Sequence, residues 1–295
     1  PEFDPEKAVA TRSASGKVMQ SLAAAMPGLV GGSADLAPST KTLIDGADSV
    51  GPGAFGGKNL HFGVREHAMG AVLNGMALHG GFRVFGATFF VFSDYFRPAI
   101  RLAALMKLPV IYVLTHDSFY VGEDGPTHQP VEHLCALRCI PNCTVIRPAD
   151  PTETGMAWLA ALENTSGPTA LILTRQNLEV IDRTKYASAA GVRKGAYVLW
   201  QSADGKPDVT LIASGSEVGL AMSAAAELAA ERTVRVVSMP SWELFERQDS
   251  SYKNEALPPD CASRFVLEAG VRQGWDKYAR SEERRVGKEC ATGCR

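Results

Sequence analysis

Apolar residues recur along this chain with two periods that alternate. Residues 65–79 carry apolar side chains with the i, i+3, i+4, i+7 spacing of a helix that buries one face. These side chains are Met69, Val72, Leu73 and Met76. Residues 109–114 instead read P-V-I-Y-V-L, a continuous run typical of a strand buried on both faces. The alternation predicts a parallel sheet with helices on both faces.

The same patterns place the remaining elements. Helices are expected over residues 7–26, 65–79, 93–106, 131–137, 152–163 and 214–231, and strands over 29–32, 82–87, 109–114, 143–146, 170–174, 208–213 and 234–238. The helix over 93–106 should be interrupted near Pro98. Ser214-x-x-Glu217 fits a capping box that opens the helix running to Glu231. The fold class predicted is a doubly wound, mostly parallel α/β sheet followed by a second, incomplete α/β domain.

The segment 176–195 is polar and without clear periodicity, so we expect a linker there. The predicted division is a first domain over 1–178, a linker over 179–194 and a partial second domain over 195–280. The tail 281–295, S-E-E-R-R-V-G-K-E-C-A-T-G-C-R, changes character abruptly. It is either a disordered natural tail or non-native translated sequence, and we favour the second. The absence of an initiator methionine suggests a fragment.

Composition narrows the class of protein. Lys and Arg number 30 and Asp and Glu 32, so a net charge of −2 gives no electrostatic reason to expect nucleic acid or a membrane surface as partner. No apolar run reaches membrane-spanning length, and the N-terminus lacks the features of a secretory signal. The six cysteines are most simply reduced thiols, and the four-residue spacing of Cys135, Cys139 and Cys143 is not that of a metal knuckle. We expect a cytoplasmic enzyme without metal ligands of its own.

The densest polar cluster directly follows the strand predicted over 109–114. Residues 115–130 read T-H-D-S-F-Y-V-G-E-D-G-P-T-H-Q-P. The loop holds two imidazoles and three carboxylates, those of His116, Asp117, Glu123, Asp124 and His128. Open α/β sheets bind ligands at the carboxyl ends of their strands. A solvated turn would need only one or two such residues, so we predict a functional site here.

Two further features have both a structural and a functional interpretation. Glu66 opens the apolar-faced helix 65–79, where a carboxyl group can share a proton with a ligand nitrogen. A glutamate in a first turn is also favoured simply by the helix dipole. Phe89, Phe92 and Tyr95 stand at i, i+3, i+6 and form either core or one side of a slot for a flat heteroaromatic ring.

Seven strings in this chain carry a family resemblance. They are G-G-S-A-D-L-A-P-S, F-G-V-R-E-H-A-M-G-A, A-T-F-F-V-F-S-D-Y, the loop T-H-D-S-F-Y-V-G-E-D-G-P-T-H-Q-P, R-P-A-D, L-T-R-Q-N and A-S-G-S-E-V. In this order and approximate spacing the chain resembles the transketolase family. The resemblance covers Ala10 to about Tyr278. It corresponds to the family's middle, pyrimidine-binding domain and the first part of its third domain.

The resemblance implies roles for individual residues. Glu66 corresponds to the catalytic glutamate that contacts the aminopyrimidine ring of thiamine diphosphate, and His128 to a catalytic histidine close to the reacting carbon. The other implied cofactor contacts are Asp35, Leu36, Phe89, Phe92 and Tyr95. Asp124 corresponds to the aspartate that reads a sugar hydroxyl. The implied phosphate-binding set is Arg12, Ser39, His116 and Arg175.

The resemblance also implies an activity: transfer of a two-carbon ketol unit from a ketose phosphate to an aldose phosphate, by a homodimer that uses thiamine diphosphate and Mg²⁺ or Ca²⁺. The family's first domain, which holds the diphosphate and the metal, has no counterpart here, so we expect a fragment that is inactive alone. Three alternatives stay open. The first is dihydroxyacetone synthase or another thiamine-diphosphate enzyme. The others are a noncatalytic binding or dimerisation module and a metal-dependent hydrolase built on the loop 115–130.

Overall fold

Six parallel strands form the first sheet, in the order β2-β1-β3-β4-β6-β5. The computed structural model describes residues 1–279 and 285–286. The strands of this sheet are β1 (Leu29–Ser33), β2 (Asn59–His61), β3 (Arg83–Phe89), β4 (Ile111–Thr115), β5 (Thr144–Ile146) and β6 (Thr169–Leu173). The helices around it are α1 (Thr11–Ala25), α2 (Ala37–Thr40), α3 (Glu66–His79), α4 (Ser93–Leu105), α5 (His133–Arg138) and α6 (Pro151–Glu163).

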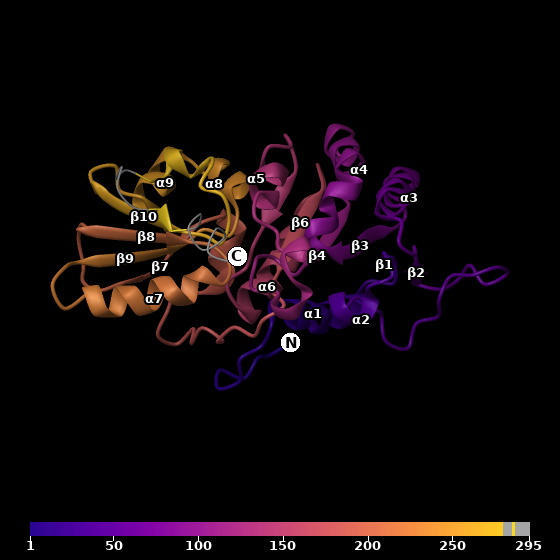
Figure 1. Ribbon diagram of the computed structural model, residues 1–295, viewed down its shortest axis with the longest axis horizontal. Coiled ribbons are helices and arrows are strands. Elements are labelled where there is room, and N and C mark those ends of the chain that lie inside the picture. The colour runs from indigo at the N-terminus through magenta and orange to yellow at the C-terminus, as the bar shows by residue number, and fades with distance from the viewer. Residues whose placement is uncertain (280–284, 287–295) are drawn as a thin grey trace.

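Alternate residues of the central strands enter two separate cores. Phe85 of β3 and Val113 of β4 pack in the core that contains Trp158 of α6. Their neighbours Val84 and Tyr112 pack instead in the core beneath α3, α4 and α5. Because every position of β4 and all but the first of β3 are buried, the strands read as mostly continuous apolar runs. Figure 1 shows the two helical layers on opposite sides of the sheet.

A second, mixed sheet lies beside the first in the order β11-β10-β8-β9-β7 (Figure 1). Only β7 runs antiparallel to its neighbour, β9. The strands are β7 (Tyr197–Gln201), β8 (Val209–Ala213), β9 (Val234–Ser238), β10 (Ser263–Leu267) and β11 (Arg285–Val286). The helix α7 (Glu217–Leu228) covers one face, and α8 (Trp242–Glu246) and α9 (Ser250–Ala256) cover the other. The predicted fold class is confirmed.

Several details differ from expectation. The first helix begins at Thr11 rather than residue 7. Val72 of α3 is 45% exposed, so its predicted place on the buried face is wrong. The predicted capping box is also wrong: α7 begins after Ser216, while the Ser214 hydroxyl donates to Glu268. The predicted interruption of the fourth helix is confirmed, because α4 is kinked at Phe96.

The segment expected as a linker is anchored to the first sheet's helices. The backbone N–H of Ile181 donates to Asp150, 3.1 Å away, and Arg183 forms an ion pair with the same carboxylate at 2.9 Å. The 3-10 helix η4 (Ala189–Lys194) then packs on α6. The domain boundaries themselves stay predictions.

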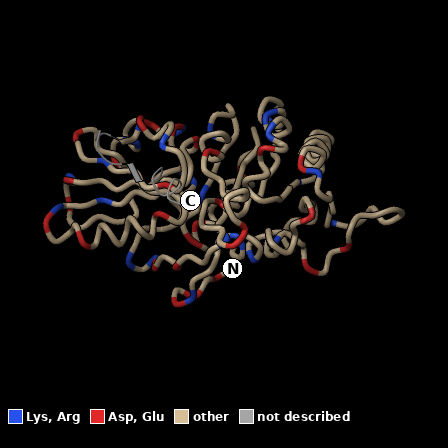
Figure 2. The backbone as a smooth tube through the Cα atoms, viewed as in Figure 1, with Lys and Arg blue, Asp and Glu red and all other residues tan. Residues whose placement is uncertain are grey.

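Charged residues of both signs are distributed over the two sheets and their helices (Figure 2). Within the described part of the chain, no helix has the length and apolar content needed to cross a membrane. The tail predicted for residues 281–295 lies outside the described residues, apart from the backbone of β11.

Candidate active site

The carboxyl ends of four neighbouring strands bring the predicted site residues to one edge of the first sheet. Asp35 follows β1, Phe89 ends β3, His116 follows β4 and Arg175 lies two residues past β6. Parallel strands share one direction, so the residues that follow them meet at one edge although they lie far apart in sequence. The loop 115–130 crosses this edge.

Three aromatic rings form a continuous ladder at the edge. Phe89 and Phe92, the latter in the 3-10 helix η1 (Phe90–Phe92), are stacked with centroids 5.8 Å apart. Phe92 and Tyr95, in the first turn of α4, are stacked at 5.7 Å. The His128 ring stands edge-on to Phe92 at 5.4 Å. Tyr95 is 66% exposed, so the ladder opens outward instead of ending in the core.

Glu66 lies buried behind this ladder as the first residue of α3. The hydroxyl of Thr88, next to Phe89 on β3, donates to its Oε1 over 3.4 Å. A buried carboxyl group beside aromatic faces can hold or exchange a proton with a flat nitrogen heterocycle. Glu66 and the three rings therefore fit the pyrimidine end of thiamine diphosphate by their chemistry.

His116 joins the ladder to the polar part of the site. Its φ of 61° is a left-handed conformation that turns the chain after β4. The ring stacks on Phe89 with centroids 3.7 Å apart, and Nδ1 lies 2.9 Å from the Thr115 hydroxyl. Burial, and then the nearby Arg12 and Arg175, lower the pKa of His116 to about 3. The imidazole is therefore neutral at pH 7, and it offers a hydrogen bond and no positive charge.

Arg12 and Arg175 are held beside each other by two threonines. The backbone N–H of Thr11 donates to the Thr174 hydroxyl at 3.0 Å, and the N–H of Thr174 donates to the Thr11 hydroxyl at 2.7 Å. The residue that follows each threonine is one of the two arginines. Burial and the charge of Arg175 lower the pKa of Arg12. Two cations held this close favour a bound anion.

Ser39 completes this arrangement from α2, because its carbonyl accepts a hydrogen bond from Arg12 Nη1 at 2.7 Å. The four residues that the resemblance implies for phosphate thus lie near one another, Ser39 through its backbone carbonyl, and their role stays a prediction. The threonine pair was missed by sequence reasoning, since residues 163 positions apart give no local signal.

The acidic residues of the loop lie over Arg175. Glu123 pairs with Arg175 Nη2 at 2.7 Å, and Asp124 stands 4.0 Å from Nε of the same arginine. Both acids belong to the 3-10 helix η2 (Gly122–Asp124). Exposed ion pairs contribute only about 0–1 kcal/mol, so a phosphate dianion can displace Glu123 at little cost.

Asp35 and Leu36 lie at the far side of the edge. Asp35 has a left-handed φ of 63°, and the N–H of Leu36 donates to the Ser33 hydroxyl at 2.7 Å. A pocket of about 220 Å³ is lined there by Ser33, Asp35, Ala37, Pro38, Leu43, His61 and Gly63. The carbonyl of Leu36 accepts from the N–H of Ser39, whose own carbonyl binds Arg12, so α2 connects this pocket to the Arg12–Arg175 pair.

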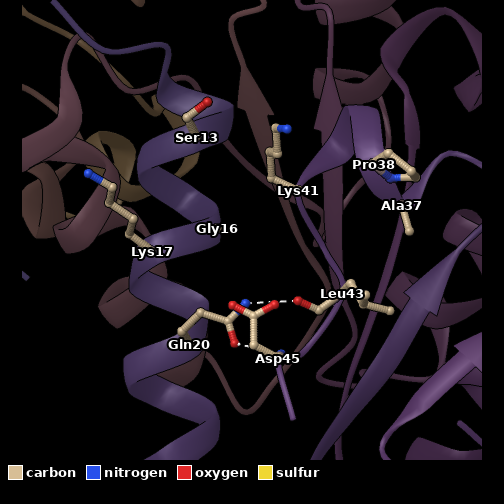
Figure 3. A pocket seen from close by; sticks show the side chains of 9 residues that line it. All are labelled: Ser13, Gly16, Lys17, Gln20, Ala37, Pro38, Lys41, Leu43 and Asp45. Carbon is tan, nitrogen blue, oxygen red and sulfur yellow. Dashed lines mark hydrogen bonds between the residues drawn. The ribbon is translucent and has the colours of Figure 1, made fainter. Parts of the chain in front are cut away.

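A second pocket, of about 330 Å³, lies between α1 and α2 (Figure 3). Gln20 closes one end through hydrogen bonds to the backbone of Leu43 and Asp45. Lys17 and Lys41 extend on opposite sides of α1 in Figure 3, so their charges do not converge. The pocket flanks the site without adding an anion-binding group to it.

Asp117 belongs to a different environment from the rest of the loop. It is buried and binds Arg147, with Oδ2 lying 2.9 Å from Nε and 2.7 Å from Nη2. Arg147 also pairs with Glu217 of the second sheet's α7 and donates to the Ser214 carbonyl at 2.8 Å. The acids flanking the guanidinium raise the pKa of Arg147, against the effect of burial. Asp117 thus joins the two sheets and is not free to act on a substrate.

A second buried ion pair extends this interface. Arg138 of α5 donates two hydrogen bonds of 2.7 Å to the carboxylate of Glu268, which follows β10. Burial alone would raise the pKa of Glu268, but Arg138 outweighs it and holds the pKa at about 2. Trp275 Nε1 also donates to this carboxylate at 2.8 Å. The interface is therefore a network of partnered charges.

The loop acids form no candidate metal centre among residues 1–279 and 285–286, where one group is close enough to hold an ion: Asp94, Glu132 and His133. This geometry argues against the hydrolase alternative, because Asp117 is occupied by Arg147 and Glu123 by Arg175.

The fold and this edge define an α/β protein of two units, with an aromatic ladder and two neighbouring arginines at the carboxyl ends of its strands. A family model described as the pyrimidine binding domain of transketolase matches residues 7–180. A second, described as the transketolase-like C-terminal domain, matches residues 195–290. The chain belongs to the transketolase family.

Comparison with individual transketolases supports this family assignment. The transketolase of Geobacillus stearothermophilus is 58% identical over 96% of this chain, which spans 42% of that relative. The Pichia stipitis transketolase solved with sedoheptulose-7-phosphate has a TM-score of 0.90 at 40% identity, over 97% of this chain and 42% of that one. A split-gene transketolase solved as an inactive β4 tetramer has a TM-score of 0.71 at 29% identity, over 91% of this chain and 82% of that one.

Proposed function

We propose that this chain supplies the pyrimidine-binding and sugar-phosphate-binding part of a transketolase site. The reaction would be transfer of a two-carbon ketol unit from a ketose phosphate to an aldose phosphate. One observation supports this proposal most directly. The buried Glu66, the aromatic ladder and the Arg12–Arg175 pair all lie at one edge of the sheet. A heteroaromatic ring and a phosphate could therefore be bound on either side of His116 and His128.

Each residue has a role that its surroundings support. Glu66 would hold the proton shared with the pyrimidine nitrogen, and the aromatic ladder would orient the ring. Arg12 and Arg175, with neutral His116, would bind the sugar phosphate through charge-assisted hydrogen bonds. Asp124, displaced from Arg175, would accept a hydrogen bond from a sugar hydroxyl. His128 would donate or accept a proton near the reacting carbon.

Thiamine diphosphate, when bound, supplies the nucleophilic carbon of the reaction. Asp35 and Leu36 would contact it from the far side of the edge. Its diphosphate, with Mg²⁺ or Ca²⁺, would be bound by groups from outside the described residues. The chain alone should therefore bind the cofactor weakly and transfer no ketol unit, which calorimetry with magnesium present and a transfer assay can check.

We also infer that the whole enzyme is a cytoplasmic homodimer. Exposed apolar side chains on α3 and α4 support an interface beside the ladder, because soluble proteins seldom leave such a group uncovered. They are Val72, Leu78, Tyr95, Leu102 and Leu105. The split-gene relative, solved as an inactive β4 tetramer, supports an alternative assembly in which a separate chain completes the site.

The proposal can be tested in a chimera that joins the first part of the Geobacillus stearothermophilus relative to this chain. The chimera should transfer a ketol unit from sedoheptulose-7-phosphate to an aldose phosphate. Glu66→Gln should lower kcat by roughly 10²–10⁴, since an amide cannot carry the shared proton. The loss should leave KM for the sugar nearly unchanged.

Glu227→Gln, on the exposed side of α7, is the matched control and should keep full turnover. Near-normal turnover of Glu66→Gln at saturating thiamine diphosphate would disprove the acid–base role. A chimera that folds and binds the cofactor but transfers nothing would contradict the proposed function as a whole.

A further inference from the structure

A histidine and two carboxylates meet behind the aromatic ladder, between the starts of α4 and α5. His133 is the first residue of α5, and its ring stands against Phe90 with centroids 5.7 Å apart. Its Nε2 lies 3.1 Å from Asp94 Oδ2. One ligand atom from each of Asp94, Glu132 and His133 lies within 4.8 Å of the others.

The two imidazole nitrogens have different surroundings. The His133 side chain is only 5% exposed, so both nitrogens depend on protein partners. Nε2 has Asp94, but Nδ1 is buried and has no hydrogen-bond partner. The nearest charged atom to Nδ1 is Glu132 Oε2 at 3.8 Å, which is too far for a hydrogen bond.

With Nε2 beside Asp94, His133 presents its unpartnered Nδ1 to a carboxylate oxygen, and a cation between these two atoms would be bound by both. Ligands of one transition ion, each about 2.1 Å from it, stand roughly 3–4 Å apart, and 3.8 Å falls within that range. An imidazole whose second nitrogen is held by a carboxylate is also the usual form of a metal-binding histidine.

We propose that His133 Nδ1 and the Glu132 carboxylate bind one divalent first-row transition ion, with Asp94 holding the ring in place through Nε2. Water would fill the remaining positions, since Glu132 is largely exposed. This ion is separate from the metal expected to accompany thiamine diphosphate. The His133–Asp94 hydrogen bond would connect it to α4, which follows the ladder residue Phe92.

Co²⁺ is the probe, because its absorption reports its ligands: nitrogen and oxygen give weak visible bands, and thiolates give a strong near-ultraviolet band. The distinction matters because Cys135 lies on the same helix, partly exposed, and the exposed Cys139 caps its C-terminus. Titration of the 295-residue chain should show one saturable site with visible bands only. Bound Co²⁺ should also raise the melting temperature.

Glu132→Gln should weaken Co²⁺ at least about tenfold by removing a charged ligand, and Asp94→Asn should weaken it about tenfold by releasing the ring. Both changes are at exposed side chains, so folding should survive. Glu227→Gln, an exposed acid on α7, should leave the affinity unchanged.

Three results would overturn the proposal. They are the absence of saturable binding at millimolar Co²⁺, a thiolate band at the stoichiometric point, and equal affinity in wild type and Glu132→Gln. The first result would mean that a proton, not a metal ion, joins His133 to the two carboxylates. None of these outcomes depends on transketolase activity.

Discussion

His116 and Asp117 are consecutive residues at the end of β4, but they face two regions in which charged side chains have different surroundings. Asp117 faces the interface between the sheets, where Arg147 pairs with Asp117 and Glu217, and the buried Glu268 pairs with Arg138. His116 faces the sheet edge, where Arg175 pairs with the exposed Glu123 at 2.7 Å and with Asp124 at 4.0 Å. Charged side chains at the interface are held by protein partners inside the fold. Charged side chains at the edge can instead exchange a protein partner for a charged ligand.

This contrast predicts that the largest effect on stability comes from the interface. Arg147→Leu should lower the free energy of unfolding by about 3–5 kcal/mol, because it leaves Asp117 and Glu217 buried without a counter-charge. Urea denaturation of the purified chain measures the loss. Arg193→Leu, which breaks an exposed pair with Glu163, is the control and should cost at most about 1 kcal/mol. Equal losses of unfolding free energy in the two variants would show that the interface charges matter no more for stability than an exposed ion pair.

The next effect is pH-dependent. The folded pKa of Glu268 is about 2, below its ordinary value of 4.5. A carboxyl group with a lowered folded pKa stabilises the fold above its unfolded pKa, and this contribution is lost as the pH falls from 4.5 toward 2. It amounts to about 3 kcal/mol at pH 7.

The stability difference between wild type and Glu268→Gln should therefore be large at pH 7 and shrink steadily below pH 4.5. Unfolding experiments at pH 7, 4 and 3 can follow it. Glu163→Gln, at an exposed acid, should show no such trend. A difference for Glu268→Gln that stays constant with pH would mean that the carboxylate is not held ionised by Arg138.

At the sheet edge the effect should appear in binding. In the chimera, Arg175→Ala should raise KM for a phosphorylated sugar by the equivalent of about 1.5–3 kcal/mol, the loss of charge-assisted hydrogen bonds. The unfolding free energy should change by less than about 0.5 kcal/mol. An equal rise in KM for an unphosphorylated sugar would exclude phosphate recognition by Arg175.

The smallest effect is expected at the exposed acid that now occupies Arg175. Glu123→Gln should leave stability unchanged within about 0.5 kcal/mol. It should lower KM for the sugar phosphate slightly, because the phosphate no longer competes with a carboxylate. Steady-state kinetics on the same chimera can measure the change. A rise in KM would show that Glu123 contributes to substrate binding directly.

Much of the fold could be predicted because buried strands have a strong local signature. The runs that became β4 and β9 are apolar at most positions and were placed within two residues. The strand β2 (Asn59–His61) has three residues, two of them polar, and gives no such signature. The strand β7 was missed within the region around the linker, where its antiparallel pairing with β9 is set by a distant partner.

The sequence suggested which residues form the candidate site, but not which contacts hold them together. Family resemblance alone pointed to Arg12 and Arg175, and their juxtaposition depends on the long-range Thr11–Thr174 pair. The error at Glu217 has the same origin. Locally it fits a capping box, but the buried charge of Arg147 is a stronger partner than a helix N-terminus. Local patterns cannot weigh such competition between distant groups.

The shared strand end of His116 and Asp117 restricts how this family can recombine. A chimera that takes its two sheets from different relatives must keep Arg147 and Asp117 in one parent compatible with Glu217 and Ser214 in the other. A mismatch would move Asp117, and one peptide bond away it would shift the imidazole that stacks on Phe89. A chimera with its crossover near residue 180 should therefore need a matched set of interface charges, although none of these charges belongs to the Arg12–Arg175 pair.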